Sequence, residues 1–281
     1  MLSLARDDAA MADRRSLGML VTGMSKLARL WMSRIPTFRE TSMRLALVAS
    51  DLGGAPLDDL AEALDAIAGL AEQADQRARE VLAAAAPSLT DPEYDERIEG
   101  LRELAQVRSY FALARLLRRR TRDGELSAPD PQERGGTAPP RGGRPLTLGE
   151  RKFLARGQDR MMLDRLLRDP HPDVIRAVLG NPRITEADVV LLAARRPTYA
   201  DIQSEIAKSA RWSPRPRVRL TLVQNPYTPA TIAVPMLPLL LRGELKQIAH
   251  ATDLPRIVRA GALDLLERRP PVRAPEEGTS Q

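Results

Sequence analysis

The stretch from Asp169 to Thr185 reads DPHPDVIRAVLGNPRIT, and the stretch from Ser213 to Thr228 reads SPRPRVRLTLVQNPYT. The two align at an offset of 44 positions, which pairs Pro170 with Pro214 and the first Asn-Pro dipeptide with the second. No other part of the chain matches itself as well. A third, degraded copy begins at Asp253. The chain is therefore organised around an internal repeat.

Each copy contains a short apolar segment with helix-breaking residues on both sides. Proline fixes its own φ and lacks an N–H, so it is tolerated in the first turn of a helix and not inside one. The residue before a proline is driven away from helical geometry, so Asn181 and Asn225 should end their helices. The segments between these stops, Val174–Leu179 and Val218–Val223, are predicted to be short buried helices.

Further helices are expected on both sides of each short one. Another apolar segment precedes each proline turn, and Thr185 and Thr228 follow the Asn-Pro pairs as candidate N-caps. The unit is thus helix, proline turn, short helix, Asn-Pro turn and helix, repeated after 44 and then 39 positions. A period of roughly 40–47 residues is typical of HEAT and armadillo repeats, which stack into α-solenoids.

These residues resemble the leucine-rich repeat variant family, which is related to HEAT repeats. The shared features are the paired prolines, the apolar short helix, the Asn-Pro turn and the threonine that follows, over roughly Leu148 to Arg269. The resemblance implies helices that alternate into a right-handed superhelix, and it implies nothing about function. Some members of that family carry a cysteine-ligated iron–sulfur module, but this chain has no cysteine, so that cofactor does not carry over.

Composition favours a folded all-α protein of the cytoplasm. Apolar residues make up 43% of the 281-residue chain and aromatic residues only 3%, so helix-forming alanine, leucine and arginine prevail. Without cysteine, neither disulfides nor a thiolate metal site can form, which suits a reducing compartment. The N-terminus lacks the pattern of a signal peptide, and the longest apolar run, Ile232–Leu241, is too short to span a membrane. We therefore expect a soluble cytoplasmic protein without membrane association.

The N-terminal part of the chain is predicted to form a helical bundle. Helical spacing of apolar residues indicates two helices between residues 16 and 52. One long apolar stripe then runs from Leu57 to a break at Pro87, and another runs from Thr90 to Leu117. Two such helices joined by a short turn predict a long antiparallel hairpin, against which the first two helices would pack.

A segment rich in proline and glycine divides the chain. Residues 123–147 have almost no apolar side chains and are predicted to be a disordered linker. This gives a helical-bundle domain over residues 1–122, a repeat domain over 148–272 and a disordered tail over 273–281. Positive charge is concentrated in the repeats, since residues 149–272 carry 21 Lys and Arg against 13 Asp and Glu, a net charge of +8, whereas the bundle carries 18 of each.

No catalytic constellation and no metal site are predicted. The two histidines, His171 in a turn and His250 on a helix, have no partners at metal-ligand spacing. Motifs for nucleotide binding or for a nucleophilic serine are missing. The carboxylates lie on amphipathic segments, where a solvated helix face explains them. We therefore expect a protein that is not an enzyme and that needs no cofactor.

The candidate interaction site is the basic turn, which we define as Arg211, Trp212, Arg215, Arg217 and Arg219. Arginine can hold phosphate or carboxylate groups through two parallel hydrogen bonds, and an exposed tryptophan offers a surface for stacking. In the alternative interpretation, Trp212 packs into the core between repeat units and the arginines are solvated. The sequence leaves both interpretations open.

The favoured function is that of a non-enzymatic scaffold or adaptor whose basic solenoid binds a protein partner. The alternative is a nucleic-acid-binding protein, because phosphate contacts need little more than clustered arginine and lysine. An enzyme on the same scaffold, such as a HEAT-like base-excision enzyme, would need aromatic side chains converging in a groove. The aromatic content of 3% argues against that third function.

Overall fold

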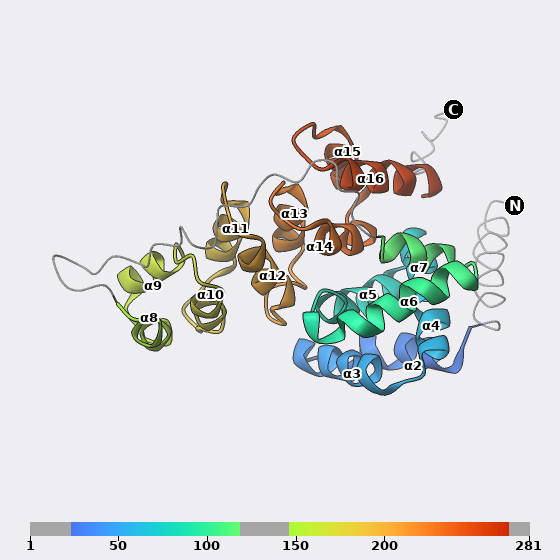
Figure 1. Cartoon of the computed structure of the whole chain (residues 1–281), viewed down its shortest axis with the longest axis horizontal. Coiled ribbons are helices and arrows are strands. Elements are labelled where there is room, and N and C mark those ends of the chain that lie inside the picture. Colours follow the sequence, from blue (N-terminus) through green and yellow to red (C-terminus); the bar gives the residue numbers. More distant parts are fainter. Residues whose placement is uncertain (1–23, 119–145, 270–281) are drawn as a thin grey trace, which may run out of the picture.

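The computed structural model describes residues 24–118, here called the N-terminal half, and residues 146–269, here called the repeat half (Figure 1). These residues form 15 α-helices and a few short 3₁₀ helices with no β-strand among them, so the predicted all-α fold class is confirmed. Within the same two ranges, no helix has the length and apolar character needed to cross a membrane. The predicted tail and nearly all of the predicted linker lie outside the described residues.

The N-terminal half packs six α-helices around one core. They are α2 (Lys26–Arg34), α3 (Thr41–Gly54), α4 (Leu57–Glu72), α5 (Gln76–Leu89), α6 (Asp95–Val107) and α7 (Phe111–Leu116), with the 3₁₀ helices η1 (Ile35–Thr37) and η2 (Pro92–Tyr94). Helix α4 is central and contacts α2, α5, α6 and α7, while α3 packs on α5. The largest core side chain is Trp31, whose indole N–H donates to the Asp51 carboxylate at 2.7 Å.

The predicted long hairpin is wrong, because each of its two helices is broken into two. Helix α4 ends at Glu72 and α5 begins at Gln76, and Ala74 between them has a positive φ of 69°. The Asp75 N–H donates to the Leu70 carbonyl across this turn at 3.0 Å, which is the hydrogen bond of a Schellman helix end. The chain therefore reverses at Ala74 instead of continuing as one helix.

The second break, between α6 and α7, is built in the same way. Ser109 has a φ of 56°, and the Tyr110 N–H donates to the Ala105 carbonyl at 2.9 Å. Neither break contains glycine or proline, the residues that usually mark a helix end, so the apolar spacing runs through both turns. The break predicted at Pro87 is also absent, since α5 continues to Leu89.

The repeat half consists of three successive sets of three α-helices. The first set is α8 (Leu148–Leu154), α9 (Arg160–Leu166) and α10 (Pro172–Leu179), and the second is α11 (Glu186–Ala194), α12 (Ala200–Lys208) and α13 (Pro216–Gln224). The third is α14 (Ala230–Met236), α15 (Arg242–His250) and α16 (Arg256–Arg268), with the 3₁₀ helix η4 (Leu237–Leu239) after α14. In each set the first helix packs on the third, and the third packs on the second helix of the next set (Figure 1).

The predicted short helices are α10 and α13, and their inward positions are buried. Val174, Leu179, Val218 and Val223 all belong to the core of the repeat half. Helix α10 ends at Leu179 and α13 at Gln224, so both helices end where the Asn-Pro turns begin, as predicted.

The two asparagines of these turns also tie each set together. The Asn181 amide nitrogen donates to the carbonyls of Ala155 and Gly157, just beyond α8, at 2.8 Å each. The Asn225 amide nitrogen donates to the two corresponding carbonyls at the end of α11, at 2.7 and 2.9 Å. Carbonyls at a helix C-terminus have no partner within their own helix. Each asparagine lies in the turn after the third helix of its set and stabilises the C-terminal end of the first helix of that set.

The two halves have separate cores and meet at η4. Leu239 of η4 is buried in the core of the N-terminal half, where α5 also packs against α12 and α14. Arginine side chains satisfy three successive carbonyls at this point: Arg79 donates to Leu239, and Arg269 donates to Pro238 and Leu240 at 2.7 and 2.6 Å. An apolar contact and a polar one therefore join the halves, in addition to the chain between them.

Glu72 provides the second polar connection between the halves. Its side chain is 6% exposed and accepts hydrogen bonds from Arg115, on α7, at 2.8 and 2.5 Å. The same carboxylate lies 3.4 Å from the guanidinium of Arg268, on α16. A buried carboxylate is thus neutralised by one arginine from each half, which offsets the cost of removing it from water.

Candidate functional site

Trp212 of the basic turn is a core residue. It is 2% exposed, and its indole N–H donates to the Leu179 carbonyl, at the end of α10, at 2.9 Å. A ring that is buried and hydrogen-bonded in this way cannot offer a stacking surface to a ligand. Burial therefore supports the alternative interpretation of Trp212, in which it joins two repeat units.

Arg211 is held against the preceding Asn-Pro turn. Its guanidinium donates to the carbonyls of Asn181 and Ile184 at 2.9 and 3.1 Å, and it lies 4.3 Å from the centre of the Trp212 ring. Arg211 and Trp212 thus both donate to backbone carbonyls at and after the end of α10, which connects α12 and the turn after it to the first set of helices.

The remaining arginines of the basic turn point to different surroundings. Arg215 is exposed, with its guanidinium 3.8 Å from the Glu186 carboxylate. Arg217 is also exposed, and its side chain makes no hydrogen bond or ion pair with the described residues. Arg219 is partly buried and faces the N-terminal half. The structure therefore brings Arg211 and Trp212 together and separates both from Arg219.

Arg219 opens onto a cleft between the two halves, which we call the inter-half cleft. This cavity of about 400 Å³ is bounded by α3 and α5 on one side and by α13, η4 and the start of α15 on the other. Arg44 and Arg79 face it from the N-terminal half, and Arg219 and Glu244 face it from the repeat half. The residues of this cleft come from distant parts of the chain, so no motif in the sequence indicates it.

The two innermost arginines of the cleft are not paired with a carboxylate. The Arg79 guanidinium donates to the Leu239 carbonyl and that of Arg219 to the Pro214 carbonyl at 2.6 Å, and neither forms an ion pair with the described residues. Burial, together with the nearby charge of Arg79, lowers the pKa of Arg219 to about 10. Burial also lowers the pKa of Arg79, while Glu244 opposes that shift. Positive charge is thus concentrated here without full compensation.

Arg44 completes one wall of the cleft and is more fully satisfied. Its side chain donates to the carbonyls of Phe38 and Pro36 at 2.7 and 3.3 Å. Its guanidinium also lies 3.8 Å from the Glu80 carboxylate. Arg44 and Glu80 therefore neutralise each other, so the excess charge of the cleft rests on Arg79 and Arg219.

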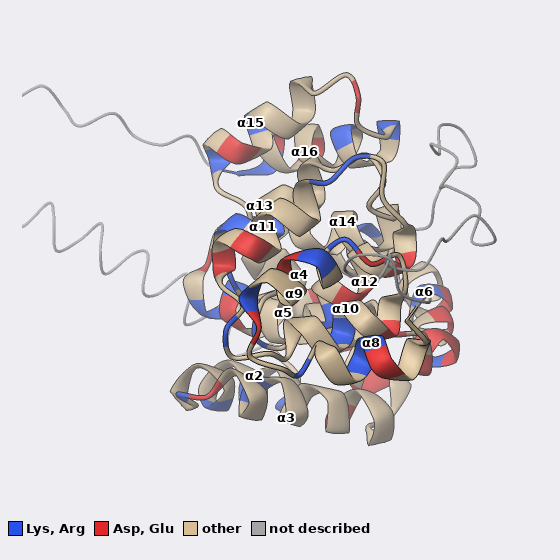
Figure 2. Ribbon diagram, turned by 90° about the vertical axis from the view of Figure 1, so that its left-hand side faces the viewer, with Lys and Arg blue, Asp and Glu red and all other residues tan. Residues whose placement is uncertain are grey.

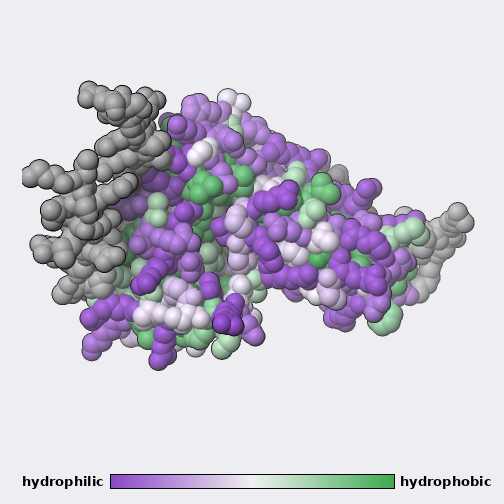
Figure 3. Space-filling view, turned by 180° about the vertical axis from the view of Figure 1, so that it is seen from behind, coloured by the Kyte–Doolittle hydropathy of each residue, from purple (hydrophilic) through white to green (hydrophobic). Residues whose placement is uncertain are grey.

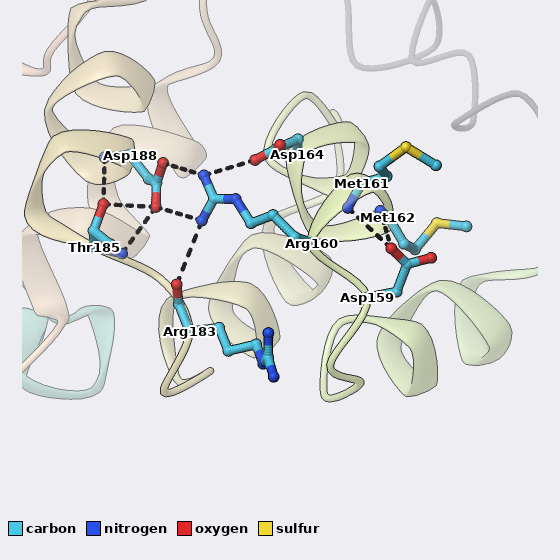
Figure 4. Close-up of polar contacts among 8 residues, drawn as sticks. All are labelled: Asp159, Arg160, Met161, Met162, Asp164, Arg183, Thr185 and Asp188. Carbon is cyan, nitrogen blue, oxygen red and sulfur yellow. Dashed lines mark hydrogen bonds and ion pairs between the residues drawn. The ribbon is translucent and has the colours of Figure 1, made fainter.

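Several carboxylates of the repeat half connect helices. Arg160 donates to Asp188 at 2.9 and 2.5 Å and pairs with Asp164 at 2.8 Å, as Figure 4 shows. Asp188 also accepts from the backbone N–H of Thr185 at 2.9 Å, in the capping box of α11. The guanidinium and these bonds hold the pKa of the Asp188 carboxyl well below its usual value. This network joins the first and second sets. The carboxylates of Asp164 and Asp188 therefore have a structural role as partners of Arg160.

The two histidines have local structural partners. The His171 imidazole accepts from the Asp173 N–H at 3.2 Å and caps α10, and the His250 ring lies 2.7 Å from the Lys246 carbonyl. Residues 24–118 and 146–269 contain no group of three His, Cys, Asp or Glu side chains that could hold a metal ion.

Charge differs between the halves. The described N-terminal half carries 12 Lys and Arg against 15 Asp and Glu, a net charge of −3, and the described repeat half carries 21 against 13, a net charge of +8. Figure 2 shows a concentration of acidic residues on α6. Two arginines of the repeat half contact the N-terminal half: Arg268 pairs with the Glu72 carboxylate, and Arg269 donates to the Glu72 backbone carbonyl at 3.2 Å.

Comparison with protein-family models, with curated proteins and with solved structures finds no match to this chain.

Proposed function

We propose that the protein is a non-enzymatic α-helical scaffold of the cytoplasm, whose repeat half binds a protein partner as a short solenoid of the HEAT or leucine-rich repeat variant kind. The contacts between successive sets support the solenoid, since the third helix of one set packs on the second helix of the next. The equivalent bonds of Asn181 and Asn225 support a common repeat unit.

One observation carries the proposal of a protein partner: equivalent positions in two successive sets expose a large apolar side chain. Phe153 is the sixth residue of α8 and Leu191 is the sixth residue of α11. Phe153 is 74% exposed and Leu191 is 73% exposed. Both helices begin with a threonine capping box, so the two positions correspond in structure. Figure 3 shows such isolated apolar groups among polar ones on the repeat half. Aromatic side chains such as that of Phe153 are enriched at protein interfaces.

Basic side chains lie beside the first of these anchors. A hollow of about 470 Å³ next to α8 is lined by Lys152, Arg156 and Arg176, together with the Asn-Pro turn of the first set. Lys152 and Arg176 pair with Asp173, and Arg176 also pairs with Glu205, whereas Arg156 makes no ion pair with the described residues. An apolar anchor with a basic rim suits a partner surface that is apolar at its centre and acidic around it.

Several contacts of the arginines count against the nucleic-acid alternative. Of the basic turn, Arg211 and Arg219 direct their donors at backbone carbonyls of this chain. Arg160 is occupied by Asp188 in the same half. The net charge of +8 therefore overstates the number of arginines that could contact phosphates.

The test compares the wild-type chain with the double variant Phe153→Ser, Leu191→Ser as bait in lysate of the source cells. We expect a co-purifying protein to be retained by the wild type and lost from the double variant. The control is Val107→Ser, which changes a residue that is 78% exposed in the N-terminal half and should leave retention unchanged. All three proteins should unfold at similar temperatures, because exposed side chains contribute little to the core.

Two results would contradict the proposal. Retention of the same protein by the double variant would remove the apolar anchors from the interface. Retention on immobilised DNA that falls steeply with salt, and that the double variant keeps, would favour the nucleic-acid alternative.

A further inference from the structure

The lining of the inter-half cleft carries three arginines and two glutamates, and Arg44 pairs with Glu80, so Arg79 and Arg219 share the one remaining carboxylate, Glu244. Arg79 and Arg219 each carry five N–H donors, and each directs one hydrogen bond to a backbone carbonyl of the described residues. Their Nε atoms are buried without a hydrogen-bond partner. The cleft thus contains guanidinium groups whose donors are only partly used by the described residues.

The net charge of the residues that line the cleft indicates the charge of a ligand that would neutralise it. Arg44 and Glu80 pair with each other across the wall. Glu244 acts electrostatically on both Arg79 and Arg219, and it is fixed in place because its carboxylate accepts from the Leu241 N–H at 2.7 Å. Among the residues that line the cleft, the two remaining positive charges and one negative charge leave an excess of one. A singly charged anion would neutralise the cleft, whereas a phosphate monoester, with a charge of about −1.5 to −2, would exceed that need and meet Glu244.

Apart from Thr41 and Gln76, the uncharged residues that line the cleft are apolar. Leu239, Leu240 and Leu241 line it from the repeat half, with Pro214 and Pro216 beside them and alanines of α5 opposite. A cavity of about 400 Å³ falls within the usual range of small-molecule sites, roughly 300–1,000 Å³. The ligand should therefore have an apolar body in addition to its charged group.

We propose that the inter-half cleft binds a small organic acid, with its single carboxylate between Arg79 and Arg219 and its apolar body against Leu239–Leu241. Guanidinium and carboxylate groups form paired, charge-assisted hydrogen bonds, which are stronger than those to backbone carbonyls. Since α5 supplies one arginine and α13 the other, the ligand would also bridge the two halves.

The experiment measures the binding of octanoate to the full-length protein by isothermal titration calorimetry, with octanol and octyl phosphate as comparison probes. We expect octanoate to bind at one site per chain and to raise the melting temperature. Octanol lacks the charge and octyl phosphate carries too much of it, so both should bind more weakly than octanoate.

The decisive variant is Arg219→Gln, and its matched control is Arg217→Gln on the same helix. Arg219→Gln removes the charge at the cleft and should weaken octanoate binding roughly ten- to a hundredfold. Arg217 is exposed and faces no part of the cleft, so its variant should bind as the wild type does. If Arg219→Gln does not fold, Leu241→Glu serves instead. It changes a residue that is 60% exposed and adds a further carboxylate to the cleft beside Glu244, which should abolish binding.

The proposal is overturned if the wild type shows no octanoate binding, or if octanol binds equally well. It is also overturned if Arg219→Gln, or Leu241→Glu in its place, binds octanoate with wild-type affinity. Tighter binding of octyl phosphate than of octanoate would refute the charge balance on which the choice of ligand rests.

Discussion

Trp212 shows how a single side chain can join two repeat sets. Its indole N–H satisfies the Leu179 carbonyl at the end of α10, and Arg211 covers the ring while bonding to the neighbouring turn. A tryptophan beside arginines is compatible with a binding surface and with a core contact, so the sequence could not distinguish them. Whether Trp212 is a core residue or a binding residue depends on whether α10 packs against its ring. That contact is set by tertiary packing and not by the local sequence.

We predict that Trp212→Phe lowers the free energy of unfolding by about 1–3 kcal/mol, because it keeps an aromatic ring and leaves a buried carbonyl without its donor. Urea denaturation followed by circular dichroism measures the change. Arg217→Gln, an exposed substitution nearby, should leave the midpoint where it is. An unchanged midpoint for Trp212→Phe would mean that this hydrogen bond does not stabilise the fold.

At the scale of elements, the two helix breaks of the N-terminal half depend on backbone conformations that L-amino acids adopt at a cost. Ala74 and Ser109 both have positive φ, at positions where glycine is usual. Each is held by the hydrogen bonds of a Schellman motif, and Asp75 then caps α5 by accepting from the Ala78 N–H at 2.8 Å. The tertiary contacts of α4 with α5 therefore outweigh the local strain.

We predict that Ala74→Gly raises the free energy of unfolding by roughly 0.5–1 kcal/mol, because glycine adopts positive φ without the clash of a Cβ. Thermal unfolding of the full chain measures it. Ala66→Gly, within α4, is the matched control and should lower stability by about the same amount. If both variants were destabilised alike, Ala74 would not occupy the left-handed conformation in solution.

These elements also show which features a sequence can predict. The prolines and Asn-Pro pairs restrict the backbone directly, so α10 and α13 could be placed closely. The breaks at Ala74 and Ser109 carry no such signal, because alanine and serine are common in helices and the apolar spacing continues through the turns. Asp75 was the one available sign, as an N-cap residue in the middle of an apparently continuous stripe.

At the scale of the whole molecule, the contact between the halves could not be predicted, and neither could the inter-half cleft. Arg79 and Arg219 meet because α5 packs near α13 and η4, and no spacing along the chain encodes that proximity. The basic turn could be found from composition, but its arginines separate because α13 turns Arg219 toward the N-terminal half while Arg211 bonds to the preceding set.

We predict that the halves stay together when the chain between them is cut. A protease site inserted within residues 123–147 of the full chain would be cleaved, and the two fragments should elute as one species in gel filtration. Leu239→Asp, which buries a charge in the core of the N-terminal half, should release them, whereas Leu263→Asp, at a residue that is 46% exposed, should not. Separate elution of the unsubstituted fragments would show that the contact at η4 is too weak to hold the halves without the covalent chain.

The place of Leu239 in the core of the N-terminal half has a consequence for synthesis on the ribosome. That core is otherwise built from residues up to Leu117, so one of its members is translated 122 residues after the rest. At about 5–20 residues per second, the nascent N-terminal half waits roughly 6–24 s for Leu239 to emerge. During that interval the nascent chain exposes the apolar core residues against which Leu239 will pack. This exposed surface could bind a chaperone until the third set of helices is synthesised and η4 covers it.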